Sequence, residues 1–282
     1  MKCFYHEDLD GRMAMNIVAQ YEENYNEEDY FEVDYVQPIP FDLIKPGERV
    51  YFVDYSFSLS TKDRLTKLME ITNDIIWIDH HESSIKLEKE HPEFKEIPGI
   101  RVNGKISGAG LTWMYLHKEE DLSKAPEEVR LTSDYDCWIL SNKKAMLFKL
   151  GMDSIPHTKV TDEIWNKFEK DSVLTMSRII DAGLTIQKYI TEQNKIYVNK
   201  YGFETTIKGY KALVCNKRDN SLLFGDLIKE YDLVCPFIYN GEKYVYSLFT
   251  DKDYVNCGEI AETFGGGGRE QCAGFSTKEC IF

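Results

Sequence analysis

The stretch Lys2–Gly11, KCFYHEDLDG, sets the pattern for the first half of the chain. A short run of β-forming residues ends there in histidine and aspartate. The same plan returns in Arg49–Asp54, RVYFVD, and in Asp74–His81, DIIWIDHH. Between these runs, apolar residues recur at helical spacing over Arg12–Tyr21 and Thr61–Ile71, which predicts helices there. This alternation predicts an α/β fold whose N-terminal part has a mostly parallel sheet covered on both faces.

The sequence pattern changes twice along the chain and predicts three parts. Residues 1–160 are expected to form the parallel-sheet domain, and residues 161–207 a helical connector. Residues 208–282 contain further β-forming runs with a hairpin turn at Asn240-Gly241, and are expected to form a smaller α/β domain. The glycine run Gly265–Gly268 lies in this last part.

The composition argues against several classes of protein. Lys and Arg total 34 of the 282 residues against 48 Asp and Glu, giving a formal net charge of −14. Proteins that bind long nucleic acids present a basic stripe, so no such partner is expected. Short phosphorylated substrates remain compatible with this charge, because bound cations offset carboxylates. No run approaches the roughly 18 apolar residues of a membrane helix.

The compartment is inferred from the N-terminus and the cysteines. Met1–Tyr5 lead directly into charged residues, so no signal peptide is expected. The seven cysteines are odd in number and form no C-x-x-C pair. A disulfide framework or a structural zinc site is therefore not expected, and a cytoplasmic location is the expectation.

Groups that bind metals follow each of the three predicted strands. They are His6, Asp8 and Asp10 after the first strand, Asp54 after the second, and Asp79, His80 and His81 after the third. Ligands of open α/β sheets bind beyond the carboxyl ends of the strands, so these groups are expected to meet. Each group alone also fits a helix cap, a turn or a packed polar residue. Their coincidence favours bound cations, because so many carboxylates would otherwise repel one another.

The types of ligand narrow the choice of metal. Imidazole with carboxylate suits Mn²⁺, Fe²⁺, Zn²⁺ or Co²⁺ better than an all-oxygen Ca²⁺ site. Five or six ligands exceed the needs of one catalytic ion. Two ions about 3.5–4 Å apart are a recurring arrangement for phosphate-ester hydrolysis. The sequence therefore predicts two divalent ions, with Mn²⁺ as the first candidate.

Two further segments are candidates for the site. Ser133–Asp136, SDYD, offers two carboxylates, although a helix cap is the competing interpretation of both. Gly265–Arg269 is too rich in glycine for the interior of a helix or strand, and its backbone N–H groups and arginine suit a phosphate. A flexible turn is an equally common use of such a run. It is not a Walker A motif, because no Gly-Lys-Ser/Thr follows.

The ordered pattern resembles the DHH phosphoesterase superfamily. It is carried by His6-x-Asp8-x-Asp10-Gly11, then Asp54, Asp79-His80-His81, Asp134 and the glycine run. The chain is most similar to the RecJ-like and nano-RNase (oligoribonuclease) branch, over nearly its whole length. The resemblance implies a DHH metal-binding catalytic domain in residues 1–160 and a DHH-associated substrate-binding domain in residues 208–282.

The resemblance also implies a role for each residue of the pattern. One ion is bound by His6, Asp8 and Asp54, and the other by Asp10, Asp54, His80 and Asp134. His81 faces the substrate and Asp79 orients an imidazole, while Asp136 has no implied role. Gly266, Gly267, Gly268 and Arg269 bind the substrate. Arg269 stands where the family has histidine; it can hold phosphate but does not titrate near neutral pH.

The implied activity is hydrolysis of short single-stranded oligonucleotides, down to dinucleotides, to 5′-mononucleotides. One alternative is the same chemistry on a cyclic dinucleotide, a small nucleotide or pyrophosphate. The other is a non-catalytic regulator that binds nucleotides. The sequence leaves the choice of RNA or DNA, the cleavage polarity and the oligomeric state open.

Overall fold

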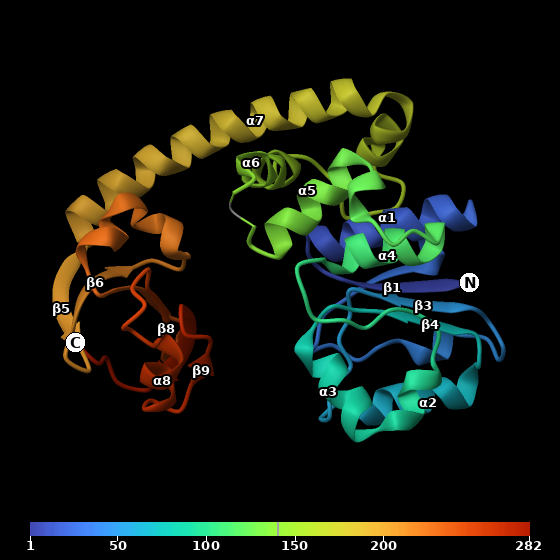
Figure 1. Cartoon of the computed structure of the whole chain (residues 1–282), viewed down its shortest axis with the longest axis horizontal. Coiled ribbons are helices and arrows are strands. Elements are labelled where there is room, and N and C mark those ends of the chain that lie inside the picture. The colour runs from blue at the N-terminus through green and yellow to red at the C-terminus, as the bar shows by residue number, and fades with distance from the viewer. Residues whose placement is uncertain (140) are drawn as a thin grey trace. The chain divides into compact units, whose positions relative to one another are not determined.

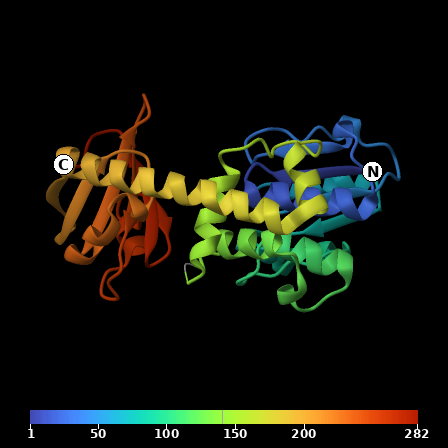
Figure 2. The ribbon, with the colours of Figure 1, turned by 90° about the horizontal axis from the view of Figure 1, so that it is seen from above.

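A computed structural model describes residues 1–139 and 141–282. The chain divides into two compact units, Met1–Ile186 and Gln187–Phe282, each with its own sheet. The division falls inside the long helix α7 (Glu163–Tyr201), drawn in yellow in Figure 2. The helical backbone of α7 is interrupted at Asp171 (φ −156°, ψ 80°). The division into three parts at residues 160 and 207 stays a prediction.

Four parallel strands form the sheet of the N-terminal unit, in the order β2-β1-β3-β4 (Figure 1). Three are the expected ones: β1 (Lys2–His6), β3 (Val50–Val53) and β4 (Ile75–Ile78). The edge strand β2 (Tyr30–Val33) was not predicted, because its two central residues are not buried and give no continuous apolar run. The prediction of a parallel-sheet α/β domain is confirmed.

Helices cover both faces of this sheet. One face carries α1 (Leu9–Glu22) and α4 (Gly108–His117), with α5 (Glu127–Asp136) packed beside them. The other carries α2 (Lys62–Ile71) and α3 (Glu82–Glu90) (Figure 1).

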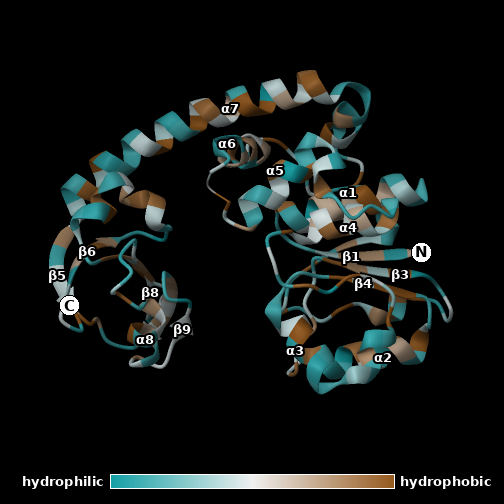
Figure 3. Ribbon diagram, in the orientation of Figure 1, coloured by the Kyte–Doolittle hydropathy of each residue, from teal (hydrophilic) through white to brown (hydrophobic). Residues whose placement is uncertain are grey.

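Neighbouring residues of one strand serve opposite cores, because successive side chains point to opposite faces. Tyr51 and Val53 pack toward α1 and α4, and Phe52 packs toward α2 and α3. Brown, apolar residues mark β1 and α1 in Figure 3. The strands are therefore buried on both sides, and only their ends are available for a site.

Two glycines let α7 pack closely against α6 (Lys143–Met152). A Cβ atom on Gly183 would lie 1.8 Å from the backbone oxygen of Leu147, and one on Gly151 would lie 2.1 Å from that of Ile179. No other residue fits at either position without moving a helix.

The C-terminal unit has a mixed sheet of six strands in the order β5-β6-β7-β8-β10-β9. They are β5 (Phe203–Ile207), β6 (Tyr210–Asn216), β7 (Leu233–Tyr239), β8 (Tyr244–Phe249), β9 (Gly267–Gly268) and β10 (Cys272–Thr277), with the short helix α8 (Cys257–Glu262). The hairpin at Asn240-Gly241 joins β7 to β8 as predicted. The predicted connector is helical only to Tyr201, since β5 begins at Phe203.

The glycine run differs from its expected form. Gly267 and Gly268 are a short strand that pairs antiparallel with Gly274 and Ala273 of β10. A Cβ on Gly268 would lie 2.5 Å from the Cα of Ala273, so glycine is required by the close approach of the two strands. The run was expected to be too rich in glycine for the interior of a strand, and the strand that it forms is only two residues long.

Membrane-spanning helices and disulfides are the two features that the sequence argues against. Among the helices of residues 1–139 and 141–282, none is long and apolar enough to cross a membrane. All seven cysteines lie in the described part of the chain, and none of them forms a disulfide there.

Candidate metal centre

The carboxyl ends of the four parallel strands lie at one edge of the N-terminal sheet. His6 is the last residue of β1, Asp54 follows β3, and Asp79 follows β4. Parallel pairing in register, with Tyr5 beside Val53 and Val53 beside Ile78, aligns these ends. We call the polar side chains gathered there the His–Asp cluster. It comprises His6, Asp8, Asp10, Asp54, Asp79, His80, His81, Asp136 and Cys137.

Asp54 is the centre of the cluster and is almost fully buried, with 1% of its surface exposed. Neither of its carboxylate oxygens has a hydrogen-bond partner among the described residues. Its backbone is left-handed (φ 54°), which is uncommon for a residue other than glycine. The nearest positive group is the imidazole of His80, whose Nε2 lies 3.3 Å from Asp54 Oδ1 without forming a hydrogen bond. A buried carboxylate with neither oxygen hydrogen-bonded is costly unless cations compensate it. This side chain therefore fits a metal ion.

His80 faces several carboxylates at once. Its Nε2 lies 3.3 Å from Asp54 Oδ1 and 3.4 Å from Asp136 Oδ2. Asp10 Oδ2 is 3.9 Å from the same nitrogen. An imidazole surrounded by carboxylates at these distances is a suitable metal ligand.

Among residues 1–139 and 141–282, three overlapping groups of side chains have ligand atoms within 4.8 Å of one another. They are His6, Asp8 and Asp54; Asp54, His80 and His81; and His80, Asp136 and Cys137. Asp54 belongs to two of the three groups. The position of Asp54 between two sets of ligands fits the bridging role that the sequence resemblance implies.

The pKa values of the cluster reflect its crowded negative charge. Burial and the neighbouring Asp10 and Asp8 raise the pKa of Asp54 well above its usual range. Burial and Asp10 raise the pKa of Asp136 to about 7. Burial lowers the pKa of His80. The hydrogen bond with Cys137 and the charges of Asp10 and Asp136 raise it by more, so that the pKa is about 9. Burial and the neighbouring carboxylates thus disfavour the ionised form of Asp54 and Asp136, and a divalent cation would favour it.

Asp8 holds His6 and the start of helix α1 together. The His6 ring Nδ1–H donates to Asp8 Oδ2 at 2.7 Å, and the Gly11 backbone N–H donates to Asp8 Oδ1 at 2.9 Å. The Asp8 bond is the main reason that the pKa of His6 is raised. Burial raises the pKa of Asp8, but these two hydrogen bonds outweigh it and the net shift is downward. Nε2 of His6 is left available as a ligand atom.

Asp79 holds His81 in a similar way. Asp79 is fully buried, and its Oδ1 accepts a 2.7 Å hydrogen bond from His81 Nδ1. Its Oδ2 accepts from the hydroxyl of Ser84 in α3. The His81 side chain is 38% exposed, and its role in facing a substrate stays a prediction. Asp79 thus holds one imidazole of the cluster by a hydrogen bond, and its role in orienting His81 stays a prediction.

Asp10 is joined to the N-terminus of α4. Its Oδ1 accepts from the hydroxyl of Ser107 and the N–H of Ala109, and its Oδ2 accepts from the N–H of Gly108. A carboxylate at a helix N-terminus is stabilised by the helix dipole. Asp10 therefore has hydrogen-bond partners of its own within the cluster, and its role as a ligand stays a prediction.

Asp134, a predicted ligand, belongs to none of the potential metal groups found among the described residues, and its role stays a prediction. Its Oδ2 accepts a 2.6 Å hydrogen bond from Asn142, and Asp136 takes the place beside His80. Both residues belong to helix α5, in which residues two apart point about 200° away from each other. Only one of them can face the site. Asp136, the other carboxylate that the SDYD segment offered, is the one that lies beside His80.

Cys137 is a second neighbour of His80 that sequence analysis missed. It caps the C-terminus of α5 and shares a potential metal group with His80 and Asp136. A thiolate favours softer ions than a carboxylate does. Its only sequence signal is its position next to Asp136.

Gly108 is another residue that sequence analysis missed. A Cβ at this position would lie 2.5 Å from the Cβ of Asp54 and 2.6 Å from its Oδ1. The first turn of α4 can therefore approach Asp54 only because residue 108 is glycine. The run Ser107–Gly110, SGAG, is its sequence signal: a helix cap followed by small residues.

The predicted substrate-binding residues of the C-terminal unit form a hairpin. The strand pair that contains Gly267 and Gly268 is followed by a turn in which the Arg269 N–H donates to Cys272 O at 2.7 Å. Arg269 is exposed. Substrate binding by Gly266, Gly267, Gly268 and Arg269 stays a prediction.

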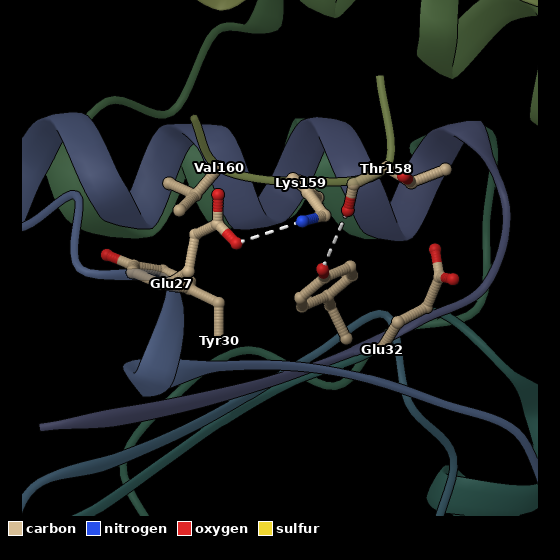
Figure 4. Close-up of a pocket in the computed structure, with 7 residues that line it drawn as sticks. Glu27, Tyr30, Glu32, Thr158, Lys159 and Val160 are labelled. Atoms are coloured by element: carbon tan, nitrogen blue, oxygen red, sulfur yellow. Dashed lines mark hydrogen bonds and ion pairs between the residues drawn. The ribbon is translucent and has the colours of Figure 1, made fainter. Parts of the chain in front are cut away.

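A cavity of about 260 Å³ on the N-terminal unit lies outside the His–Asp cluster (Figure 4). Its lining includes Tyr5, Glu27 and Thr158. The Tyr5 hydroxyl donates to the backbone oxygen of Thr158 at 3.0 Å, and Lys159 pairs with Glu27 at 3.1 Å. The first contact joins the segment before α7 to β1, and the second joins it to Glu27, shortly before β2. The lining of the cavity includes no member of the His–Asp cluster.

Comparisons of sequence reveal one distant relative. No family model matches the chain. An uncharacterized protein of Acanthamoeba polyphaga mimivirus is 25% identical over 245 residues, which cover 82% of this chain and 53% of that protein. The chain thus spans about half the length of the curated relative it matches.

Comparisons of structure give matches over almost the whole chain. A DHH domain described as belonging to a family of ribosomal proteins matches with a TM-score of 0.58 and 12% identity, covering 96% of this chain and 81% of that one. The pGpG-specific phosphodiesterase PggH from Vibrio cholerae matches with a TM-score of 0.55 and 12% identity, covering 99% and 94%. At such low identity these likenesses show the fold alone. The chain has the fold of the DHH-domain proteins, as the resemblance of its sequence implies.

Proposed function

We propose that this chain is a metal-dependent phosphodiesterase that hydrolyses short single-stranded oligonucleotides to 5′-mononucleotides. The observation that carries the proposal is Asp54, a buried carboxylate with no donor among the described residues, between two groups of His and Asp side chains. A buried carboxylate in this state is stabilised by a bound cation, whatever family the chain resembles.

The residues suited to hold two divalent ions divide around Asp54. His6 and Asp8 share one group with it, and His80 is a member of the other. Asp136 lies beside His80 and takes the role first predicted for Asp134. When bound, such ions supply positive charge to the phosphoryl oxygens and activate water at neutral pH. Mn²⁺ is the metal we expect.

His81 is the residue we assign to proton handling at the substrate. Its Nδ1 is bound to Asp79, which fixes the ring and leaves Nε2 to face outward. A proton held at Nε2 can be donated to the leaving oxygen of the ester. His81→Ala should therefore lower turnover more than metal content.

The proposed substrate class rests on charge and on one structural likeness. The net charge of −14 disfavours long nucleic acids. PggH, of similar fold, is described as specific for pGpG, a linear dinucleotide. We assign Arg269 and the adjacent glycines to binding the substrate's terminal phosphate or base. Cyclic dinucleotides, pyrophosphate and small nucleotides are the alternatives, and a substrate panel separates them.

The test is an assay with labelled di- to pentanucleotides in the presence of Mn²⁺. Asp54→Asn should lose both bound metal and turnover, because the new amide cannot bridge two cations. Asp136→Asn should lose most of the turnover. Asp134→Asn is the matched control on the same helix and should stay active.

Two outcomes would contradict the proposal. Absence of hydrolysis across the panel, with nucleotide binding that needs no metal, would favour the alternative of a non-catalytic regulator. Full activity of Asp54→Asn would show that the chemistry lies elsewhere.

A further inference from the structure

Trp138 follows the last residues of helix α5 in an unusual backbone conformation. Its φ is 55°, in the left-handed region, which is an outlier for a bulky side chain. The Trp138 N–H donates to Tyr135 O at 3.0 Å, and the Ile139 N–H donates to Asp134 O at 2.7 Å. These two bonds define a Schellman motif, in which Trp138 occupies the position where glycine is usual.

The fold therefore explains the backbone at this position but not the side chain. Glycine would close the same motif without the strain. The Trp138 side chain also gains little from packing, because 43% of its surface is exposed. The other three tryptophans, Trp77, Trp113 and Trp165, are all buried. An exposed, strained aromatic residue is a candidate for a contact with a ligand.

Trp138 is next in sequence to two members of the His–Asp cluster. It directly follows Asp136 and Cys137, which share a potential metal group with His80. Its ring meets the ring of Tyr135 edge to face, with centroids 6.1 Å apart. Lys149 lies 5.6 Å from the centre of the Tyr135 ring. Tyr135 thus supports one part of the indole and leaves much of it open to solvent.

We propose that Trp138 stacks against a nucleobase of the substrate, so that the site selects phosphodiesters that carry nucleosides over inorganic pyrophosphate. This inference rests on the proposed function and narrows its substrate class. Stacking on an aromatic ring accepts any base, because every base has a π face. The indole, carried by the residue that follows Cys137, would hold the base while the ester lies at the metal ligands.

The first experiment measures binding and needs no turnover. Since the other three tryptophans are buried, the exposed indole should account for most of the fluorescence that a ligand can quench. A 5′-mononucleotide with Mn²⁺ should quench it, and inorganic phosphate with Mn²⁺ should not. Trp138→Phe should remove the quenching signal.

The second experiment measures kinetics of variants at this one position. Trp138→Gly should raise KM for a dinucleotide roughly 5- to 150-fold, the range expected from the loss of one stacked base, with a smaller effect on kcat. Because glycine relieves the backbone strain, Tm should stay unchanged or rise. Trp138→Phe should restore most of the affinity. Tyr21→Ala, at an exposed aromatic residue near the far end of α1, is the control and should leave KM unchanged.

The outcomes separate this inference from the proposed function. If no substrate is hydrolysed but nucleotides still quench the indole, the catalytic proposal fails and base stacking stands. If dinucleotides are hydrolysed and Trp138→Gly keeps the wild-type KM, stacking is wrong and the catalytic proposal stands. Equal quenching by phosphate and by a nucleotide, or a lower Tm for Trp138→Gly with unchanged KM, would also overturn the inference.

Discussion

At the scale of single residues, Asp54 is held in a state that the fold alone does not favour. Its carboxylate is buried without donors, and its backbone is left-handed. Asp10, Asp8 and Asp79 add negative charge around it. Each of these features lowers the stability of the metal-free chain, and a bound cation reverses the electrostatic part.

Asp54→Asn should therefore raise the stability of the metal-free chain while it abolishes metal binding. The neutral amide removes the charge repulsion, and asparagine tolerates a left-handed backbone well. We expect a gain of at least about 1 kcal/mol in the free energy of unfolding. Thermal unfolding in EDTA, with and without added Mn²⁺, measures both effects. A metal-free variant less stable than wild type would contradict this account.

At the scale of elements, the start of α4 shapes the site. Ser107, Gly108 and Ala109 donate to Asp10, and the lack of a side chain at Gly108 lets the helix reach Asp54. Helix α4 therefore fixes the carboxylate of Asp10 by hydrogen bonds and that of Asp54 by van der Waals contact.

Gly108→Ala should damage both stability and metal affinity. The new methyl group would collide with Asp54, at a cost of roughly 1–3 kcal/mol, and would displace the carboxylate. Gly104→Ala is the control, because a Cβ there meets no atom within 4 Å. Calorimetric titration with Mn²⁺ and chemical denaturation of both variants provide the comparison. Equal metal affinity in the two variants would refute the contact argument.

The elements also show how far the sequence was informative. β1, β3 and β4 are predictable because each is a buried run that ends abruptly in Asp or His. β2 is not, because an edge strand buries only part of its surface.

The choice between Asp134 and Asp136 depends on the rotational phase of α5, which a spacing of two residues in the sequence does not reveal. Gly108 matters only through its contact with Asp54, which lies far from it in sequence. Local patterns thus predict the strand ends, whereas contacts between distant segments require the structure.

At the scale of the whole molecule, the crowded carboxylates predict how stability depends on pH. The pKa of Asp136 is raised in the folded state to about 7, so the folded state binds this proton more tightly than the unfolded state does. Stability is then lost as pH rises from about 4 toward 7. His80, with its pKa raised to about 9, contributes stability that is lost as pH rises from about 6.5 to 9. Both effects have the same sign.

The metal-free chain should therefore have a lower Tm at pH 7.5 than at pH 5.5. Added Mn²⁺ should raise Tm more at pH 7.5, because the carboxylates must be deprotonated to bind it. Thermal unfolding in EDTA and in excess Mn²⁺ at the two pH values is the measurement. Asp136→Asn should flatten the dependence on pH in EDTA, and an unchanged slope would exclude Asp136 as its source.

The two carboxylates that begin the pattern are also structural parts of the helices. Asp8 caps α1 through Gly11, and Asp10 receives the first N–H groups of α4. These side chains are consequently fixed as soon as the domain has folded, before any ion is present. Metal uptake would then be limited by how fast the ion sheds its hydration water, and not by rearrangement of the chain.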